Sequence, residues 1–298
     1  DSDDDGMPDG WEAHHQLGPT RNDAQEDPDQ DGLTNLEEFI GRSQPNNPMS
    51  PNRVLFVAEN GTDQAGNGAC RTPFRSLRYA LKIAAALPAT PTRILLAEGT
   101  YDESGEGALA LSANIAIAPQ PDAEVTLIGA FIGAEGASLT GITLIPPAEK
   151  TLEPLLRLDN VRMEIREVVF GGENAQAVTG ILLTGRCIPR SLIAHCRFHN
   201  INNAIDIGGA LPVIRRCNFE NLSGSAVIIR DTGDLIVLAD GGNLGDAGDP
   251  ASGFNRFAST IEGPAVINER RQAILMQHND WDTDVPEEIA ARIQNTAP

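Results

Sequence analysis

Basic residues, aromatic residues and long apolar runs are all scarce in this sequence, and each shortage excludes a class of protein. Lysine and arginine total 22 against 42 aspartates and glutamates, which gives a formal net charge of −20 over 298 residues. Nucleic acids and anionic membranes present phosphates that need a basic surface, so neither is an expected partner. No apolar run approaches the roughly 20 residues that cross a bilayer, so we expect no membrane insertion.

Cysteine is also scarce, with four residues in the chain: Cys70, Cys187, Cys196 and Cys217. Four are too few for a disulfide scaffold at this length, and their spacings match neither a zinc ribbon nor a C-x-x-C redox motif. Cys196 and Cys217 lie 21 residues apart, and both begin the pattern Cys-x-Phe-x-Asn-x-aliphatic. Strand alternation would turn the Cys, Phe and Asn of each segment to one face. We expect two buried, stacked thiols, with a disulfide as the alternative.

The cysteine pattern belongs to a longer repeat. Related segments occupy 160–171, 192–201 and 213–222, with a looser copy at 139–145. A period between about 20 and 50 residues is typical of solenoids, whose coils contact only their neighbours. Short segments rich in β-branched residues and bounded by Gly, Asn or Asp supply the expected strands, at 125–127, 177–183, 204–207, 226–229 and 234–238. The sequence therefore predicts an all-β fold, a β-solenoid.

The composition also bears on the solenoid interior and its ends. Aromatic residues make up only 4% of the chain, which favours a core of stacked aliphatic side chains over aromatic clusters. Asn200 and Asn221 would fall on equivalent corners, where inward asparagines can hydrogen-bond the turns from coil to coil. The helical apolar spacing over 74–87 predicts an N-terminal capping helix that covers the first coil, and 286–293 predicts a short closing helix.

Acidic residues are concentrated at the start of the chain, where 13 of them face two arginines within residues 1–50. Two twelve-residue segments there carry oxygen-bearing side chains at positions 1, 3, 5, 9 and 12 around Gly6 and Gly32, the spacing with which a loop wraps a calcium ion. The first offers oxygens from Asp1, Asp3, Asp5, the Met7 carbonyl, Asp9 and Glu12. The second offers oxygens from Asp27, Asp29, Asp31, the Leu33 carbonyl, Asn35 and Glu38.

These loops predict a small EF-hand-like calcium-binding α module with two calcium sites. Calcium would fold it, because closely spaced carboxylates repel one another until a cation joins them. Asn35 is a neutral ligand, so the second site carries less charge. A small core is expected from Trp11, Leu17, Leu36, Phe39 and Ile40. The alternatives are a disordered acidic leader and a calcium sensor that opens a groove.

Several motifs resemble known families. The Thr72-Pro73-Phe74 helix start, Glu98-Gly99-Thr100-Tyr101 and the tail segment Asn279-Asp280-Trp281 resemble bacterial right-handed parallel β-helix proteins of the pectate lyase-like superfamily. The first 50 residues, which end in Pro45-Asn46-Asn47-Pro48, resemble thrombospondin type 3-like and dockerin-like repeats of exported bacterial proteins. The resemblance implies a right-handed parallel β-helix. It leaves activity open, because the superfamily mixes lyases, hydrolases and isomerases with non-catalytic adhesins.

We therefore expect a calcium-binding module at 1–50 and a β-helix at 51–298, with its cap at 51–101, coils at 102–240 and a terminal coil and cap at 241–298. No catalytic motif is recognised in the solenoid. Residues that could contribute to a ligand surface are Asp206, Arg215, Arg216, Asp231 and Trp281. For each of them a turn, surface or packing role is the simpler interpretation, and Trp281 is expected to pack in the cap rather than against a sugar.

Calcium loops of this kind also fill at the millimolar calcium found outside cells, so we expect a secreted or cell-surface protein. The chain opens on the first ligand of a loop, which suggests a processed or excised chain, so the lack of an export signal carries little weight. The expected function is display of an elongated surface that binds carbohydrate or a cell-surface component. The alternatives are a polysaccharide lyase or other carbohydrate-active enzyme, and a structural spacer of a larger surface protein.

Overall fold

The computed structural model describes residues 1–30, 33–41, 43–47, 53–64, 68–86, 91–148, 153–172, 177–185, 191–231, 244–246, 252–271 and 273–296. The chain forms two compact units, one of residues 1–99 with 116–123 and the other of 100–115 with 124–298. The first unit holds both the acidic segment and the first coil. The domain boundary expected after residue 50 stays a prediction. Of the described residues, no helix is both long enough and apolar enough to span a bilayer.

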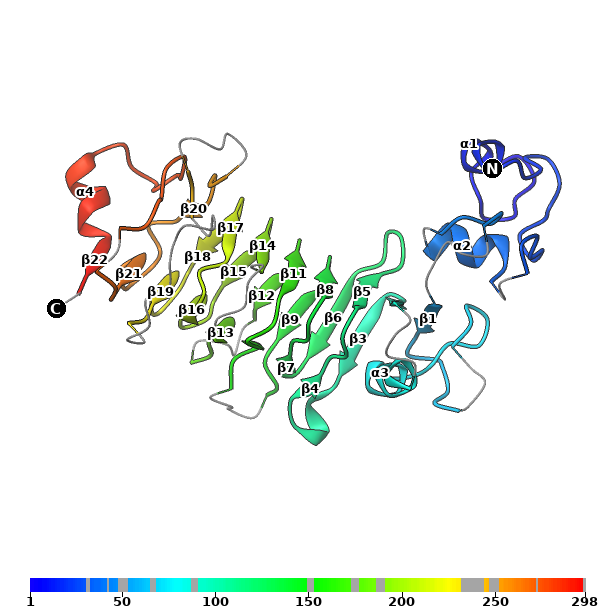
Figure 1. The fold of residues 1–298 in the computed structure, drawn as a ribbon, viewed down its shortest axis with the longest axis horizontal. Coiled ribbons are helices and arrows are strands. Elements are labelled where there is room, and N and C mark those ends of the chain that lie inside the picture. Colours follow the sequence, from blue (N-terminus) through cyan, green and yellow to red (C-terminus); the bar gives the residue numbers. More distant parts are fainter. Residues whose placement is uncertain are drawn as a thin grey trace. The chain divides into compact units, whose positions relative to one another are not determined.

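The second unit is a parallel β-solenoid, in which each coil adds one strand to each of three sheets (Figure 1). In the first sheet the order is β8 (Ala137–Thr140), β11 (Met163–Arg166), β14 (Leu192–Ala194) and β17 (Val213–Arg215). In the second it is β4 (Leu109–Ala110), β7 (Phe131–Ile132), β10 (Leu156–Asp159), β13 (Ile181–Gly185), β16 (Ile205–Gly209), β19 (Val227–Ile229), β21 (Val266–Asn268) and β22 (Ile293–Asn295). In the third it is β3 (Gly99–Asp102), β6 (Val125–Ile128), β9 (Thr143–Ile145), β12 (Val169–Gly171), β15 (Arg197–His199), β18 (Asn218–Glu220) and β20 (Arg256–Phe257). The predicted solenoid is confirmed, while the strand expected at 234–238 lies outside the described residues.

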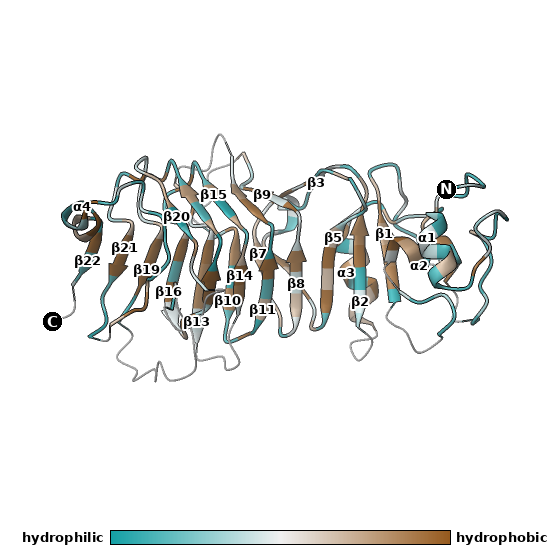
Figure 2. Ribbon diagram, turned by 90° about the horizontal axis from the view of Figure 1, so that it is seen from above, coloured by the Kyte–Doolittle hydropathy of each residue, from teal (hydrophilic) through white to brown (hydrophobic). Residues whose placement is uncertain are grey.

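Alternation along each strand explains why the coils stack. In β11 the side chains of Met163 and Ile165 are buried, while those of Glu164 and Arg166 face outwards. The strand register places Ile165 between Leu139 and Ile193 of the neighbouring coils, so aliphatic side chains form a continuous row. Figure 2 shows the same alternation as brown and teal bands along the strands. Burial of this repeating apolar face is the main driving force for the fold.

Aromatic side chains form a second interior row, which contradicts the expectation of a purely aliphatic core. Phe170, Phe198, Phe219 and Phe257 occupy the same position in four successive coils, and their rings stack 4.8–5.1 Å apart. Trp281 ends the row at 4.5 Å from Phe257 and is only 7% exposed. Low aromatic content was a poor guide because nearly half of the nine phenylalanines fall on this one row.

Two residues before each of the last four rings of the row, Phe198, Phe219, Phe257 and Trp281, the chain carries a cysteine or an asparagine. Cys196 and Cys217 are buried free thiols whose Sγ atoms lie 3.6 Å from the carbonyl oxygens of Ile165 and Ile193. In the next two coils asparagines replace them. The Asn255 side-chain oxygen accepts from the Cys217 N–H at 3.0 Å, and that of Asn279 accepts from the Asn255 N–H at 2.9 Å. The predicted stacked thiols are confirmed for this pair.

The inward asparagine row was predicted at the wrong positions. Asn221 is exposed and Asn200 is half-buried, and both have left-handed backbone, with φ of 51° and 55°. Asparagine tolerates this conformation better than most residues, so these two serve the turn through their backbone. The interior asparagine row consists instead of Asn255 and Asn279.

The first unit contains the first coil of the solenoid together with the acidic segment. Strand β1 (Arg53–Val57) pairs in parallel with β2 (Thr92–Leu96), and most of β5 (Ile115–Pro119) belongs to the same unit. The predicted capping helix is α3 (Leu77–Ala85), which packs on β1 and β2. It begins after Ser76, whose side chain accepts a hydrogen bond from the Tyr79 N–H and so caps the helix.

The acidic segment itself covers one face of this coil. Its helices are α1 (Asp9–His14) and α2 (Asn35–Gly41). Leu33 and Ile40 pack on a buried cluster of Val54, Phe56 and Leu95. Gly41 has no Cβ, and one placed there would lie 2.9 Å from Val54, so glycine permits the close approach. The acidic segment and the first coil therefore share one apolar interface.

A 3₁₀ turn (Ser104–Glu106) precedes β4 at the start of the second unit. At the other end of this unit lies the predicted closing helix, α4 (Pro286–Ala291). Arg292 follows α4 and donates to the main-chain carbonyls of Phe257, Ala258 and Trp281. Its guanidinium thus satisfies carbonyls at the end of the aromatic row, and burial lowers the pKa of Arg292.

Candidate metal centre

The first predicted loop closes around its own backbone N–H groups. Asp1 accepts hydrogen bonds from the N–H groups of Asp5 and Gly6 at 3.1 and 3.0 Å, and Asp5 accepts one from Met7 at 3.0 Å. Gly6 has a φ of +95°, a conformation that a side chain would strain, so the turn requires glycine here. Both carboxylate oxygens of Asp1 and the Oδ1 of Asp5 are thereby held by the loop, and Asp5 Oδ2 is left without a hydrogen-bond donor.

Three buried carboxylates meet at the centre of the module. Asp5, Glu12 and Asp23 each offer an oxygen, and these atoms all lie within 4.8 Å of one another. The three residues are 8%, 0% and 4% exposed. A second group of Asp1, Asp3 and Asp5 shares a member with the first, so the two groups form one continuous cluster.

The oxygens turned towards this centre have no hydrogen-bond donor. They are Asp3 Oδ2, Asp5 Oδ2, both carboxylate oxygens of Glu12, and Asp23 Oδ1. Buried charges in native proteins are normally paired or coordinate a metal ion, because leaving them bare costs several kcal/mol. Burial raises the pKa of Glu12, and the neighbouring carboxylates of Asp3, Asp5 and Asp23 raise it further. The arrangement fits a hard divalent cation that takes oxygen ligands, such as calcium.

Asp23 was missed by the sequence analysis. It lies outside both twelve-residue windows, in the segment that connects them, and joins the cluster because the chain folds back. Its Oδ2 accepts a hydrogen bond from the Gly18 N–H at 3.0 Å, which aims Oδ1 at Asp5 and Glu12. Only its acidic character and its position between two loops could have suggested it.

Asp9 and Met7, two further predicted ligands of the first loop, do not belong to the central group of Asp5, Glu12 and Asp23. The Asp9 carboxylate is exposed and accepts hydrogen bonds from the Ser2 N–H and hydroxyl at 2.7 and 2.6 Å, which lower the pKa of Asp9 to about 2. It therefore closes the loop from outside the carboxylate cluster. The Met7 side chain is fully buried, and its main chain lies between Asp5 and α1.

The second loop is described except for Asp31, which lies outside the described residues together with Gly32. Asp27 accepts a hydrogen bond from the Gln30 N–H at 2.8 Å, and the fully buried Glu38 accepts one from the Ser43 hydroxyl at 3.2 Å. Asn35 donates to the Asp23 carbonyl at 2.9 Å, so it connects the second loop to the first cluster. Among the described residues, the carboxylates of Asp27, Asp29 and Glu38 do not form a compact group.

Helix α2 joins the second loop to the solenoid through a motif that the sequence analysis also missed. Thr34 and Glu37 form a capping box, in which the Glu37 carboxylate accepts from the Thr34 N–H at 2.9 Å and the Thr34 hydroxyl accepts from the Glu37 N–H at 3.3 Å. The other Glu37 oxygen accepts from the Cys70 N–H at 3.1 Å, and Arg93 donates to the Gly41 carbonyl. Polar contacts thus add to the apolar interface around Ile40.

The proposed ligand-surface residues do not form one site. Asp206 lies on the second sheet in a bidentate ion pair with Arg230, at 3.0 and 2.8 Å, and Asp231 follows that arginine in the chain. This hydrogen bonding raises the pKa of Arg230. Arg215 and Arg216 lie at the corner between the first and third sheets. Trp281 is in the interior row, as its expected packing role required.

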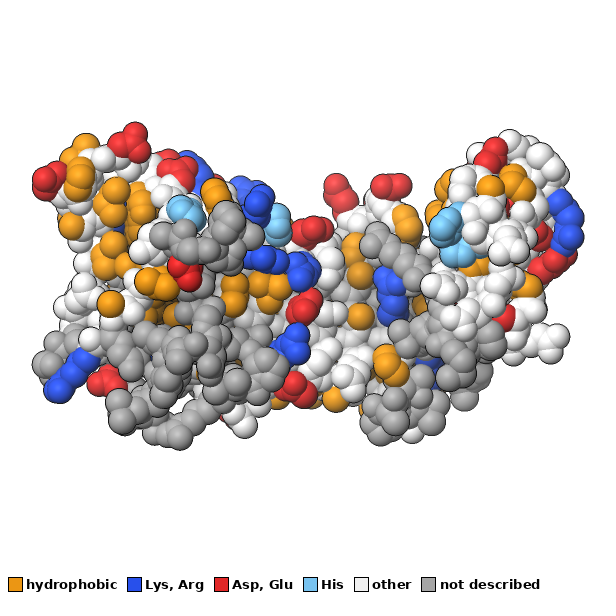
Figure 3. All heavy atoms as spheres, turned by 45° about the horizontal axis from the view of Figure 1, so that its top comes forward, with side chains coloured by type: hydrophobic (Ala, Val, Ile, Leu, Met, Phe, Trp, Pro, Cys, Tyr) orange, Lys and Arg blue, Asp and Glu red, His pale blue; other side chains and the backbone are white. Residues whose placement is uncertain are grey.

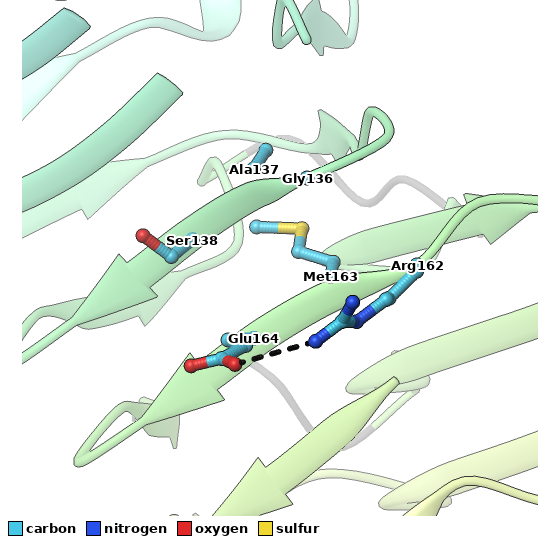
Figure 4. Close-up of a pocket in the computed structure, with 6 residues that line it drawn as sticks. All are labelled: Gly136, Ala137, Ser138, Arg162, Met163 and Glu164. Carbon is cyan, nitrogen blue, oxygen red and sulfur yellow. Dashed lines mark ion pairs between the residues drawn. The ribbon is translucent and has the colours of Figure 1, made fainter. Parts of the chain in front are cut away.

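Two hollows on the surface of the solenoid, among the described residues, contain charged side chains. One of about 320 Å³ lies over the starts of β8 and β11 (Figure 4). There the Arg162 side chain turns towards Glu164, which also accepts from Arg166 at 3.3 Å, and Ser138 lies on the next strand. A larger hollow of about 510 Å³ lies beside α4 and includes Glu262, Asp282 and Glu288. Within the described residues, the carboxylate groups compact enough to hold a cation all lie in the N-terminal module.

Comparison with known proteins adds no relative, since no protein-family model, curated protein or solved structure matches this chain.

Proposed function

We propose that this chain is an exported calcium-binding β-helix protein of the pectate lyase-like type, which presents an elongated surface for binding carbohydrate or another cell-surface component without catalysing a reaction. The observation that carries the proposal is the buried cluster of Asp5, Glu12 and Asp23, with carboxylate oxygens that lack hydrogen-bond donors. A module built around bare carboxylates requires a cation in order to fold. Calcium-dependent folding suits a compartment where calcium is abundant, which is the basis for proposing export.

A binding role is supported over a catalytic one by how the solenoid uses its charged side chains. Lyases and hydrolases need a basic residue or a pair of carboxylates held free beside the substrate. Here Arg230 is engaged by Asp206 and Glu269, and Glu164 by Arg166. These acids hold the solenoid surface together through contacts between and within coils.

Calcium titration calorimetry tests the metal site directly. We expect two calcium ions per chain, with the first-loop site lost in Glu12→Gln because this variant removes a buried central ligand. Glu26→Gln is the matched control, since Glu26 is exposed and paired with Arg21. Unchanged calcium binding by Glu12→Gln would contradict the assignment of the first site.

A glycan array and a polysaccharide digestion panel test the rest of the proposal. Binding to one or more glycans without release of shortened or unsaturated products is the expected result. Release of such products would favour the enzyme alternative. Absence of binding to every glycan, together with intact calcium binding, would favour a structural spacer.

A further inference from the structure

One corner of the solenoid carries a row of outward side chains at the position where the chain leaves the first sheet. The residue there has left-handed backbone in six successive coils, with φ between 55° and 67°: Gly141, Glu167, His195, Arg216, Phe254 and His278. Strand register aligns the first five positions, because their preceding residues pair from coil to coil. The Phe254 N–H donates to the His278 carbonyl at 2.9 Å, which places His278 beside them. The last four, His195, Arg216, Phe254 and His278, are all exposed. We call these four the corner row.

Side chains of the corner row stack on one another. The Arg216 guanidinium carbon lies 5.4 Å from the centroid of the Phe254 ring, and the Phe254 and His278 rings are 5.6 Å apart and nearly parallel. Phe254 is 49% exposed, more than any other large apolar side chain that the structure describes. Stacking uses the flat face of a guanidinium and leaves its N–H edge available for an oxyanion, so the row holds Arg216 ready to donate.

The arginines at this corner differ from their neighbours in having no acidic partner. Each nearby arginine on the outer faces forms an ion pair with a carboxylate: Arg162, Arg166, Arg197, Arg230 and Arg256. Among the described residues, neither Arg215 nor Arg216 does so, although acidic residues outnumber basic ones almost two to one. In addition, Arg215 Nε is buried and has no hydrogen-bond acceptor, which is costly unless a ligand supplies one.

Figure 3 shows arginine and histidine side chains gathered beside apolar ones on this face of the solenoid. We propose that the corner row, together with Arg215, binds a linear anionic glycan through its carboxylate or sulfate groups. The inference deepens the proposed carbohydrate-binding function and rests on it. Local charge supports it at Arg215 and Arg216, which have no ion-pair partner among the described residues, while the exposed Glu167 lies at the other end of the same corner, beside His195. Exposed charges more than about 10 Å away are largely screened at 0.1 M salt.

Spacing favours a glycan over other anionic polymers. The row repeats once per coil, at roughly 4.8 Å, which is close to the length of one pyranose unit in a linear chain. An extended acidic peptide presents side chains to one face only every ~6.6 Å and would run out of step with the row. Single-stranded nucleic acid binds by stacking bases on open aromatic faces, whereas Arg216 and His278 already stack on Phe254.

Binding of defined oligosaccharides to the full chain in calcium-containing buffer tests the proposal. The probes are a hexagalacturonate for carboxylates, a sulfated dextran oligosaccharide for sulfates, a neutral maltohexaose and a short poly-glutamate. We expect one or both anionic oligosaccharides to bind, with salt-dependent affinity. Arg215→Gln and Arg216→Gln should each weaken binding at least about tenfold, because each removes a charge-assisted hydrogen bond. Arg216→Lys keeps the charge but loses the planar fork, so it should restore only part of the affinity.

Arg271→Gln is the matched control, because Arg271 is also exposed but follows β21 at another corner. It should bind like the unmodified chain, and circular dichroism should show that every variant is folded. Wild-type affinity in the Arg215→Gln, Arg216→Gln double variant would overturn the inference. Binding of neutral glycans alone would overturn it while sparing the proposed function, and equal binding of poly-glutamate would assign the row to an acidic protein. If no glycan binds, both the corner-row inference and the proposed carbohydrate-binding function are contradicted.

Discussion

The N-terminal module and the solenoid coils are built around opposite kinds of side chain. At the centre of the module lie the carboxylates of Asp5, Glu12 and Asp23, whereas the centre of the coils holds stacked rings such as Phe198 and Phe219. Burial alone stabilises the rings, because removing apolar surface from water is favourable at any calcium concentration. The carboxylates repel one another and gain stability only when a cation joins them. Under the proposed function, one chain combines a core whose stability depends on calcium with a core whose stability does not.

The two kinds of core meet at α2, which begins in the second predicted loop and packs through Ile40 on the first coil. In a solenoid each coil contacts only its neighbours, so a change at one end weakens with distance along the coils. Calcium should therefore control the stability of the first coil strongly and that of the later coils little.

The largest effect is expected from truncating a ring of the interior row. Phe219→Ala should lower the free energy of unfolding by about 3–5 kcal/mol, because Phe219 is fully buried between Phe198 and Phe257 and a cavity would remain. Phe254→Ala is the matched control, since the same substitution on a ring that is 49% exposed should cost less than about 1 kcal/mol. Urea unfolding in saturating calcium measures both. Equal costs would refute the idea that the row carries the stability of the coils.

Calcium removal should have the next largest effect, and it should be local. A ligand present at 100 times its Kd stabilises the folded state by about 2.7 kcal/mol, so EGTA should remove roughly this amount from the module. Hydrogen exchange read by mass spectrometry should then accelerate in residues 1–47 and in β1, but not in β15 or β18. Uniform acceleration along the whole chain would show that the two cores unfold as one.

A smaller effect, opposite in sign in the two calcium states, is expected from acid. Without calcium, the raised pKa of Glu12 means that the folded state binds a proton more readily than the unfolded chain. Stability should therefore increase as the pH falls from 7 towards the ordinary carboxyl value of 4.5. With calcium, the same proton competes with the metal, and stability should decrease.

Thermal unfolding across this pH range, with EGTA or with calcium, measures both trends. Glu12→Gln cannot take up the proton, so it should lose the acid stabilisation in EGTA. If that variant keeps the full pH dependence, another group is responsible for it.

The solenoid was predictable because its repeat leaves marks in the sequence. Cys196 and Cys217 precede a phenylalanine by two residues, and that pattern defines the period and the inward face. The left-handed corner was not predictable, because Glu167, Arg216 and Phe254 are residue types that seldom adopt positive φ. Strand pairing on both sides imposes this conformation, and the φ preference of the residues themselves does not indicate it.

For the metal centre, the loop spacing identified Asp5 and Glu12 but could not identify Asp23, which arrives through the fold of the connecting segment. The corner row could not be predicted from the sequence for a similar reason. Whether Arg215 and Arg216 have acidic partners depends on which side chains the neighbouring coils place beside them. Contacts within a loop can be inferred from spacing along the chain, whereas contacts between coils require the register.

The smallest effect is expected where the solenoid tolerates local strain. Glu167 has a φ of 56° and is exposed, and the equivalent residue of the preceding coil is Gly141. Glu167→Asn should raise the free energy of unfolding by about 0.5–1 kcal/mol, because asparagine adopts left-handed backbone at lower cost. Urea unfolding compared with Glu164→Asn, an exposed position in an extended strand, separates this effect from the change in charge. The control should be neutral or destabilising, since asparagine is disfavoured in strands and Glu164 pairs with Arg166. Stabilisation by both substitutions would trace the gain to reduced negative charge instead of relieved backbone strain.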